Sequence, residues 1–127
     1  MPPVRKHPQS HAVARARLVR VPPQVDGGTE RVEAWVESHG VIGDMDLTLC
    51  HVCGIGVIEH VRVDLPHRRH GYGRRLIDTA LAGSDLAWTT TSVIDEPAAQ
   101  FWAAVAPDLR HTPRRCRHMH QAWDAQP

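Results

Sequence analysis

The chain has 127 residues, which suits one domain of ordinary size, and 42% of them are hydrophobic, enough to bury a core. The 15 Lys and Arg residues nearly balance the 14 Asp and Glu residues, so the formal net charge is +1. That balance excludes a global field that would draw the protein onto nucleic acid or a membrane. No window reaches the roughly 20 apolar residues of a membrane span. Any electrostatic function must therefore come from a local cluster of charges.

The N-terminus and the cysteines bear on domain organisation and compartment. Residues 1–10 are rich in proline and polar side chains, and we expect them to be disordered. They contain no apolar stretch of the kind found in secretory leaders. The three cysteines, an odd number, indicate reduced thiols. We therefore expect a cytoplasmic protein with a single domain over residues 11–127.

Strand-like alternation dominates the first half of the chain. Residues 12–21 alternate apolar and basic side chains, as a half-buried strand does, and residues 22–30 form a loop. Further strands are predicted over residues 31–38, 41–52 and 57–65, with turns at 39–40 and 53–56. The short connections predict an antiparallel meander of four strands.

The period of the apolar residues changes after Gly71. Tyr72, Leu76 and Ile77 begin a helical pattern that ends near Gly83. Residues 86–94 are rich in β-forming side chains and predict a buried strand. This strand would lie parallel to the fourth strand, with the helix as the crossover between them.

A second helix and a last strand complete the predicted fold. Pro97 suits the first turn of this helix, and Pro107 ends it. Residues 114–123 are predicted to form the last strand. The expected fold class is α+β, with a mixed, mainly antiparallel sheet, two helices and the order β-β-β-β-α-β-α-β.

The turn between the fourth strand and the first helix has the sequence RRHGYG, residues 68–73. A helix N-terminus exposes unpaired N–H groups and about half a positive charge. Arg68 and Arg69 add cations that match phosphate oxygens, and Gly71 and Gly73 allow the backbone to approach an anion closely. The turn lacks the Walker A and Rossmann patterns. A diphosphate would bind well here, and a basic surface turn without a ligand is the alternative.

The stretch VRVDLPHRRHGYGRRLIDTAL (61–81) resembles motif A of the GNAT superfamily of acetyl-CoA-dependent N-acetyltransferases, [R/Q]-x-x-G-x-[G/A]. Arg68, Gly71 and Gly73 occupy its defined positions. The stretch SVIDEPAAQFWAAVA (92–106) is similar to the strand and helix that follow in the family, N-x-x-A-x-x-F-Y. Asp95 stands there in place of Asn and Trp102 in place of Tyr. The resemblance covers residues 31–106 and implies a GNAT-like fold.

The resemblance also implies that acetyl-CoA (CoA) is the cofactor. The backbone amides of residues 68–73 would hold the pyrophosphate, and the strand backbone at 61–63 would pair with the pantetheine arm. Asp95 and the region of Phe101 would flank the thiol end. The residues expected to bind the cofactor are Val61, Arg62, Val63, Arg68, Arg69, His70, Gly71, Tyr72, Gly73, Arg74, Asp95 and Phe101.

Acetyl transfer to an amine requires a base, a polarised carbonyl and a proton for the leaving thiolate. Glu59 is the best candidate for the base, with an ordinary exposed or paired carboxylate as the alternative. His51 and His60 are weaker candidates. The family commonly uses a Tyr as the acid, but Trp102 has only an indole N–H, which cannot donate a proton at neutral pH. Tyr72, the only tyrosine, is expected to pack against the helix.

The short loop between the first two strands leaves no room for the helices that cover the amine substrate in the family. We expect an open acceptor side, suited to a large acceptor such as a protein or completed by another subunit, for example in a homodimer. The first functional hypothesis is an N-acetyltransferase. The second is a catalytically silent GNAT-like protein that acts as a CoA-binding, regulatory or interaction subunit. The basic run at residues 110–118 is interpreted as a solvated segment, so nucleic acid is disfavoured as a partner.

The sequences CHVC (50–53) and CRHMH (116–120) offer thiols and imidazoles that together could form a tetrahedral zinc site. However, Cys50 and Cys53 would lie on opposite faces of a sheet if both were in a regular strand. Buried thiols are therefore the favoured interpretation, and no metal ligand is assigned.

Overall fold

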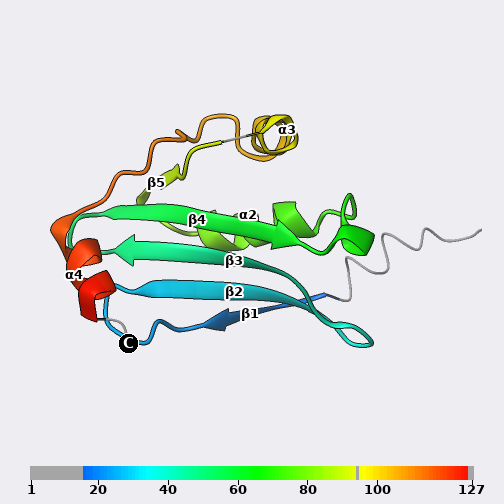
Figure 1. The fold of residues 1–127 in the computed structure, drawn as a ribbon, viewed down its shortest axis with the longest axis horizontal. Coiled ribbons are helices and arrows are strands. Elements are labelled where there is room, and N and C mark those ends of the chain that lie inside the picture. Colours follow the sequence, from blue (N-terminus) through cyan, green and yellow to red (C-terminus); the bar gives the residue numbers. More distant parts are fainter. Residues whose placement is uncertain (1–15, 94, 126–127) are drawn as a thin grey trace, which may run out of the picture.

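The computed structural model of the chain describes residues 16–93 and 95–125. Its elements in chain order are the strands β1 (Arg17–Val21), β2 (Thr29–Val36), β3 (Gly40–Cys50) and β4 (Ile55–Val63), a short 3-10 helix (Leu65–His67), helix α2 (Tyr72–Leu81), strand β5 (Ala87–Thr90), and helices α3 (Glu96–Val105) and α4 (Arg117–Ala125). Figure 1 shows these elements as a ribbon. The predicted disordered segment, residues 1–10, and the first part of the predicted first strand lie outside the described residues.

The five strands form one mixed sheet in the order β1-β2-β3-β4-β5. The first four strands are antiparallel neighbours, and β5 pairs with β4 in parallel. The predicted meander and the parallel strand after the helix are therefore confirmed. In Figure 1, α2 lies behind the sheet, α4 lies in front of it, and α3 lies beyond β5. Among the described residues, no helix has the length and apolar character that a bilayer crossing requires.

The predicted last strand over residues 114–123 is wrong, because this segment forms α4 and gives the fold three helices. Met119 and Ala122 are buried at a spacing of three, as one face of a helix requires. The alternation of basic and other side chains imitated the period of a strand. The outer edge of β5 is instead approached by Arg110, which forms an isolated parallel bridge with Thr89.

Several strands end at residues other than the predicted ones, and one of these differences changes where Cys53 lies. β5 ends at Thr90, whereas the predicted strand extended to residue 94. β3 ends at Cys50, and the turn to β4 occupies residues 51–54 instead of 53–56. Gly54 has a positive φ of 71°, and its amide donates to the Cys50 carbonyl at 2.9 Å. Cys53 therefore lies in a tight turn, outside the strand that contains Cys50.

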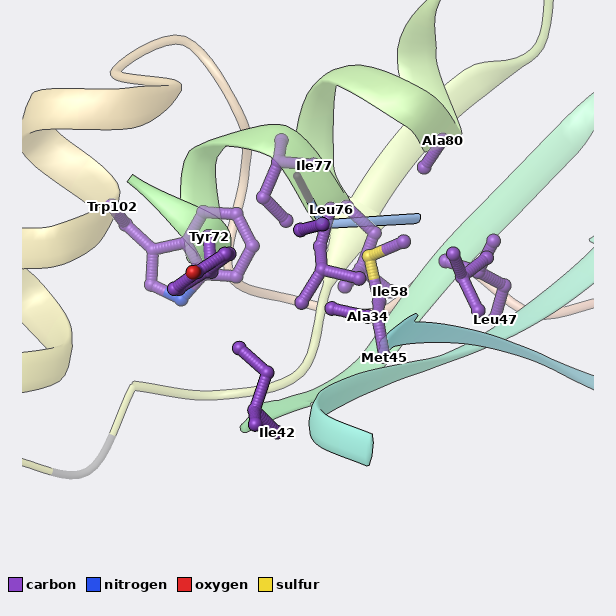
Figure 2. Close-up of a cluster of buried hydrophobic side chains, with 12 residues drawn as sticks. Ala34, Ile42, Met45, Leu47, Ile58, Tyr72, Leu76, Ile77, Ala80 and Trp102 are labelled. Atoms are coloured by element: carbon purple, nitrogen blue, oxygen red, sulfur yellow. The ribbon is translucent and has the colours of Figure 1, made fainter. Parts of the chain in front are cut away.

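Two hydrophobic cores lie on opposite faces of the sheet. The larger core lies between the sheet and α2, with Trp102 contributed by α3 (Figure 2), and consists of Ala16, Val32, Ala34, Ile42, Met45, Leu47, Ile58, Tyr72, Leu76, Ile77, Ala80 and Trp102. The smaller core lies under α4 and consists of Cys50, Ile55, Val57 and Met119. The end of the sheet that contains the β3–β4 turn is thus held from both sides.

No helix lies between β1 and β2, because residues 22–28 connect them directly as bends and turns. The expectation of a short connection is therefore confirmed. Nothing from this segment can cover the sheet as a pair of helices would.

We predict that Leu76→Ala lowers the free energy of unfolding by about 2–5 kcal/mol, because the Leu76 side chain is 0% exposed in the larger core. Leu65→Ala is the matched control, since Leu65 is 72% exposed and should change stability by less than about 0.5 kcal/mol. Chemical denaturation followed by circular dichroism measures both. Equal effects of the two substitutions would contradict the placement of α2.

Candidate functional site

Strand β4 has a strand neighbour on both sides over only part of its length. Its parallel register with β5 runs from Ile55 opposite Ala87 to Ile58 opposite Thr90. The Thr91 amide then donates to the Ile58 carbonyl at 3.3 Å, and the Thr91 hydroxyl donates to the Glu59 carbonyl at 3.1 Å. Beyond this point β4 continues beside β3 alone. Among the described residues, its second edge has no strand partner from residue 59 to 63.

A bulge at Glu59 determines where the backbone of this edge points. The register with β3 passes over Glu59, because Leu47 lies opposite Ile58 and Asp46 lies opposite His60. Farther along, the Asp64 amide donates to a β3 carbonyl, that of Ile42, at 2.8 Å. Backbone groups alternate along a strand, so those of residues 61 and 63 point away from β3. Of the predicted pantetheine-pairing residues, Val61 and Val63 therefore present backbone polar groups at the free edge, whereas the backbone groups of Arg62 face β3.

One of these groups is already bonded. The Arg68 Nε donates to the Val63 carbonyl at 2.8 Å, which agrees with the direction given by the alternation. Within the described ranges, no hydrogen bond uses the amide or carbonyl of Val61 on this edge. Val61 thus offers a donor and an acceptor side by side, the arrangement with which an amide of an extended ligand can pair.

The turn before α2 has the backbone geometry of an anion site. Gly71 is the N-cap, with a left-handed φ of 87°, and Arg69 also has a positive φ of 67°. The Arg75 amide donates to the Gly71 carbonyl at 3.1 Å and begins the helical ladder. The amides of residues 72–74 precede that ladder and are free to bind a ligand. A non-glycine residue at positive φ costs about 1–2 kcal/mol, so the turn at Arg69 is held in place by its surroundings.

Two buried polar atoms at this turn lack a partner. His70 Nδ1 and Tyr72 Oη are the buried side-chain polar atoms without a hydrogen bond in the described part of the chain. Tyr72 is 1% exposed, and burial raises the pKa of its phenol although the charge on Arg75 opposes the shift. Tyr72 is the first residue of α2, and its side chain is packed in the larger core with Leu76 and Ile77 of that helix. Both atoms are buried, so they lie under the turn and not on the surface where an anion would bind.

The arginines expected at the site take different directions. Arg68 and Arg69 are exposed at the turn, whereas the Arg74 guanidinium donates to the Ala104 carbonyl at 3.0 Å and joins α2 to α3. The Arg62 guanidinium binds Asp44 at 2.9 Å and also binds Asp64. Arg68 and Arg69 are thus the expected arginines that remain exposed at the turn itself without an ion-pair partner in the described part of the chain, although Arg68 also donates to the Val63 carbonyl.

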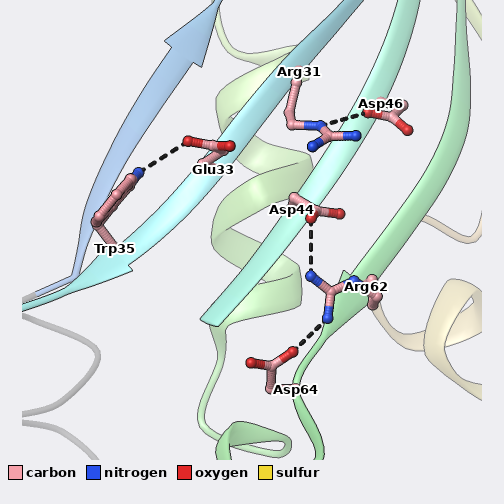
Figure 3. A network of polar contacts seen from close by, with 7 residues as sticks. All are labelled: Arg31, Glu33, Trp35, Asp44, Asp46, Arg62 and Asp64. Atoms are coloured by element: carbon pink, nitrogen blue, oxygen red, sulfur yellow. Dashed lines mark hydrogen bonds and ion pairs between the residues drawn. The ribbon is translucent and has the colours of Figure 1, made fainter. Parts of the chain in front are cut away.

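The contacts of Arg62 belong to a charged network on the face of the sheet away from α2 (Figure 3). The bonds to Asp44 and Asp64 raise the pKa of Arg62 above its ordinary value. The network also contains the pair Arg31–Asp46 at 3.1 Å. The side chain of Arg62 is thus engaged within this network, and its backbone groups face β3, so Arg62 offers no polar group to the free edge.

The carboxylate of Glu59 is fully engaged. Its two oxygens accept hydrogen bonds from the Arg115 guanidinium at 2.5 and 2.8 Å, and the Thr48 hydroxyl donates at 2.8 Å. Both charged side chains are only 17% exposed, so the pair lies largely out of water. The bond to Glu59 raises the pKa of Arg115, which keeps the guanidinium charged. The structure therefore gives Glu59 the paired state that the sequence left open as the alternative to a free base.

Helix α3 begins and packs as the second motif requires. The Asp95 carboxylate accepts a hydrogen bond from the Ala98 amide at 2.9 Å and caps the helix. Asp and Asn cap helices equally well, so Asp95 in place of Asn costs the fold nothing. The Phe101 ring lies against Gly73, where an added Cβ would be 2.7 Å from a ring carbon. Gly73 is thus required for the contact between α2 and α3.

A cavity of about 200 Å³ lies between α3 and the segment that follows it, lined by Val93, Ala99, Trp102, Ala103, Pro107 and His111. The Trp102 and His111 rings have centroids 5.8 Å apart, and His111 Nδ1 is 2.6 Å from the Thr90 hydroxyl at the end of β5. No tyrosine lies here, since Tyr72 is the only one in the chain. Sequence reasoning missed His111, because only the fold brings residue 111 to the end of β5.

A second group of side chains meets at the β3–β4 turn, away from the candidate cofactor turn. Cys50, Cys53, Cys116 and His118 place their ligand atoms within 4.8 Å of one another. Burial opposes ionisation of Cys116, but the Met119 amide, His118 and the two other thiols outweigh it and lower its pKa to about 6. Loss of hydration and the bonds to Cys116 and Cys50 raise the pKa of Cys53 to about 11. One thiolate is thus favoured in the cluster, and its charge opposes a second.

Comparison with solved structures identifies the fold. An aminoglycoside acetyltransferase from an uncultured soil metagenomic sample, solved with sisomicin, matches with a TM-score of 0.56 and 15% identity over 69% of this chain. Nourseothricin acetyltransferase matches with a TM-score of 0.54 and 17% identity over 65% of this chain. An acetyltransferase from Thermus thermophilus matches with a TM-score of 0.54 and 18% identity over 65% of this chain. The chain has a GNAT fold.

The extent of these matches is limited. The chain spans 63%, 51% and 56% of the lengths of the three acetyltransferases. No family model matches the sequence. No curated protein matches it either. The GNAT likeness therefore establishes how the chain folds, and what it acts on has to be argued from its own residues.

We predict that Gly73→Ala lowers the free energy of unfolding by about 1 kcal/mol, because crowding of Phe101 outweighs the better helix propensity of alanine. In a Phe101→Ala background the crowding is absent, so the same substitution should be neutral or stabilising. A double-mutant cycle by chemical denaturation measures the difference. Identical effects of Gly73→Ala in both backgrounds would show that the two residues do not touch.

Proposed function

We propose that the chain is a GNAT-type N-acetyltransferase that transfers an acetyl group from acetyl-CoA to an amine. The observation that carries the proposal is the coincidence of two features at one place. The β4 edge opens beyond Ile58, and the α2 N-terminus presents free amides at residues 72–74 directly after it. The GNAT fold supports the same reading.

The residues of the turn would hold the cofactor through backbone and side-chain charge. The amides of residues 72–74 and the guanidinium groups of Arg68 and Arg69 would bind the pyrophosphate. The Val61 backbone would pair with the pantetheine arm in the manner of an added strand. The bound acetyl-CoA would supply an activated acyl group as a thioester.

Proton transfer is where this chain departs from the usual pattern. Glu59 stays the proposed base, and since Arg115 and Thr48 occupy its oxygens, it can accept a proton only after one of these bonds opens. Solvent water is the competing acceptor for the amine proton. The CoA thiolate that leaves also needs a proton. The buried Trp102 supplies none, so the thiolate would take one from water.

The acceptor side favours a large substrate. The direct β1–β2 connection over residues 22–28 contributes no helical cover to the site. We therefore propose an amine on a protein, such as a lysine or a chain terminus, or a site completed by a second copy of the chain or another subunit. Electrostatic attraction of nucleic acid is not part of the proposal, because the formal net charge is only +1.

A catalytically silent CoA-binding protein is the second candidate, and a specific observation favours it. Neither expected catalytic position offers a free group for proton transfer. Glu59 is held in an ion pair with Arg115, and a tryptophan at the edge of the core occupies the position of the usual acid. In this reading the turn would still bind the coenzyme, and the chain would act as a regulatory or interaction subunit.

We predict that Gly71→Glu weakens CoA binding at least about tenfold, because its carboxylate would lie against the diphosphate. Isothermal titration calorimetry with CoA measures the affinity. Gly83→Glu is the matched control, since Gly83 has a similar positive φ of 67° and open space around it, and should bind CoA as the unaltered chain does. Unchanged affinity in Gly71→Glu, or no binding by the unaltered chain, would count against the proposed site.

Turnover separates the two candidates. Thiol release from acetyl-CoA with a panel of amines and peptides should exceed the rate without protein if the chain is an enzyme. Binding of CoA without thiol release would favour the silent subunit. If turnover is found, Glu59→Gln decides the base: a fall in kcat of about 100-fold or more indicates Glu59, and a retained kcat indicates water.

A further inference from the structure

Four side chains from two distant parts of the chain converge at one end of the sheet. Cys50 ends β3, Cys53 lies in the following turn, and Cys116 and His118 stand at the start of α4. His118 Nδ1 lies 3.6 Å from the Cys50 sulfur, 3.4 Å from that of Cys53 and 3.7 Å from that of Cys116. One imidazole nitrogen thus faces three sulfur atoms at nearly equal distances.

These separations are those of a tetrahedral metal site. Zinc binds thiolate sulfur at about 2.3 Å and imidazole nitrogen at about 2.0–2.1 Å, which places the two ligand atoms about 3.6 Å apart at the tetrahedral angle. The three observed distances scatter around that value. All four ligand atoms lie within 4.8 Å of one another, so one ion can reach all of them after small side-chain adjustments.

The local backbone prepares the first pair of ligands. The turn over residues 51–54 brings both sulfur atoms to one side, and the Cys53 amide donates to the Cys50 sulfur at 3.4 Å. Gly54 provides the positive φ with which the turn closes. An N–H group directed at a sulfur stabilises the thiolate that a metal requires. The condition that separated these two cysteines in the sequence, a shared regular strand, is not met.

The second pair stands where a helix favours negative charge. Cys116 immediately precedes α4, whose N-terminus carries partial positive charge, and the His120 amide donates to the Cys116 carbonyl at 3.3 Å. The side chain of Arg115, one residue earlier, is fixed by Glu59 and by the Trp123 ring, 4.5 Å from its guanidinium carbon. The ligands of this pair therefore start from a restrained segment.

Simple packing of thiols explains the cluster less well. Cys53 is exposed and gains little from the smaller core, although the half-buried Cys116 packs against that core. A disulfide would use two sulfur atoms and leave the third thiol and the imidazole without a reason to converge. Three thiolates and one imidazole in a tetrahedron are the ligand set that selects zinc over the hard cations.

We propose that Cys50, Cys53, Cys116 and His118 bind one zinc ion that fastens α4 to the β3–β4 turn. Four protein ligands close the coordination sphere, so the site is structural and takes no part in acyl transfer. The nine-residue α4 buries only Met119 and Ala122, and a helix of that length is marginal without a tertiary anchor. The metal would supply that anchor and would hold Arg115 against Glu59.

The test begins with metal content. The chain, purified without a polyhistidine tag or chelators, should contain about one zinc ion per chain by mass spectrometry of the elements. Cys53→Ser and His118→Ala should retain less than about a tenth of it after dialysis. His51→Ala and His120→Ala are matched controls, because both histidines are exposed neighbours of the ligands and should keep the zinc. Zinc retained equally by all four variants would overturn the site.

A second measurement uses the unaltered chain, so it holds even if a ligand variant fails to fold. Removal of zinc with a chelator should lower Tm by roughly 5 °C or more, and added zinc should restore it. Cobalt in place of zinc should show intense thiolate charge-transfer absorption and the visible bands of a tetrahedral complex. An unchanged Tm together with an octahedral cobalt spectrum, or iron as the native metal, would contradict the proposal. Neither readout depends on CoA, so the outcome is independent of the proposed function.

Discussion

The separation of β4 from β5 beyond Ile58 is the constraint on which the rest of the structure depends. The parallel register ends at Thr90, and the extra residue Glu59 then turns the backbone groups of residues 61 and 63 toward the space that β5 leaves. A strand edge in the middle of a domain would ordinarily be paired, because unpaired backbone groups carry a free-energy cost. In the described part of the chain this edge stays open directly before a helix N-terminus, and in our proposal a ligand pairs with it.

The two faces of the sheet hold this opening in different ways. On one face, the larger core fixes α2, and with it the direction of the amides at its N-terminus. On the other face, α4 and Arg115 fix Glu59 at the bulge itself. If the proposed zinc site forms, the metal supports the bulge from behind through the segment that leads into α4. The part of the chain after α3 would then contribute to the geometry of the cofactor edge without touching the cofactor.

Much of this fold follows from the sequence. The alternation in residues 31–65 and the change of period at Gly71 predicted the meander, the helix and the parallel strand, because local pattern and burial agree there. The strand prediction for residues 114–123 failed although α4 is amphipathic, because the prediction did not use the helical spacing of Met119 and Ala122. The candidate cofactor site could be predicted from the sequence only in part. Motif A located the glycine turn, because its chemistry is local. The partners of Glu59 and the meeting of Cys53 with His118 could not be read from the sequence, since both depend on where α4 packs.

The most direct test of the account is a crystal structure of the chain with bound CoA. The account predicts that the pyrophosphate oxygens lie within about 3.2 Å of the backbone nitrogens of residues 72–74, and that a pantetheine amide pairs with the backbone of Val61. Coenzyme bound elsewhere, or these nitrogens covered by protein atoms while the coenzyme is present, would contradict it.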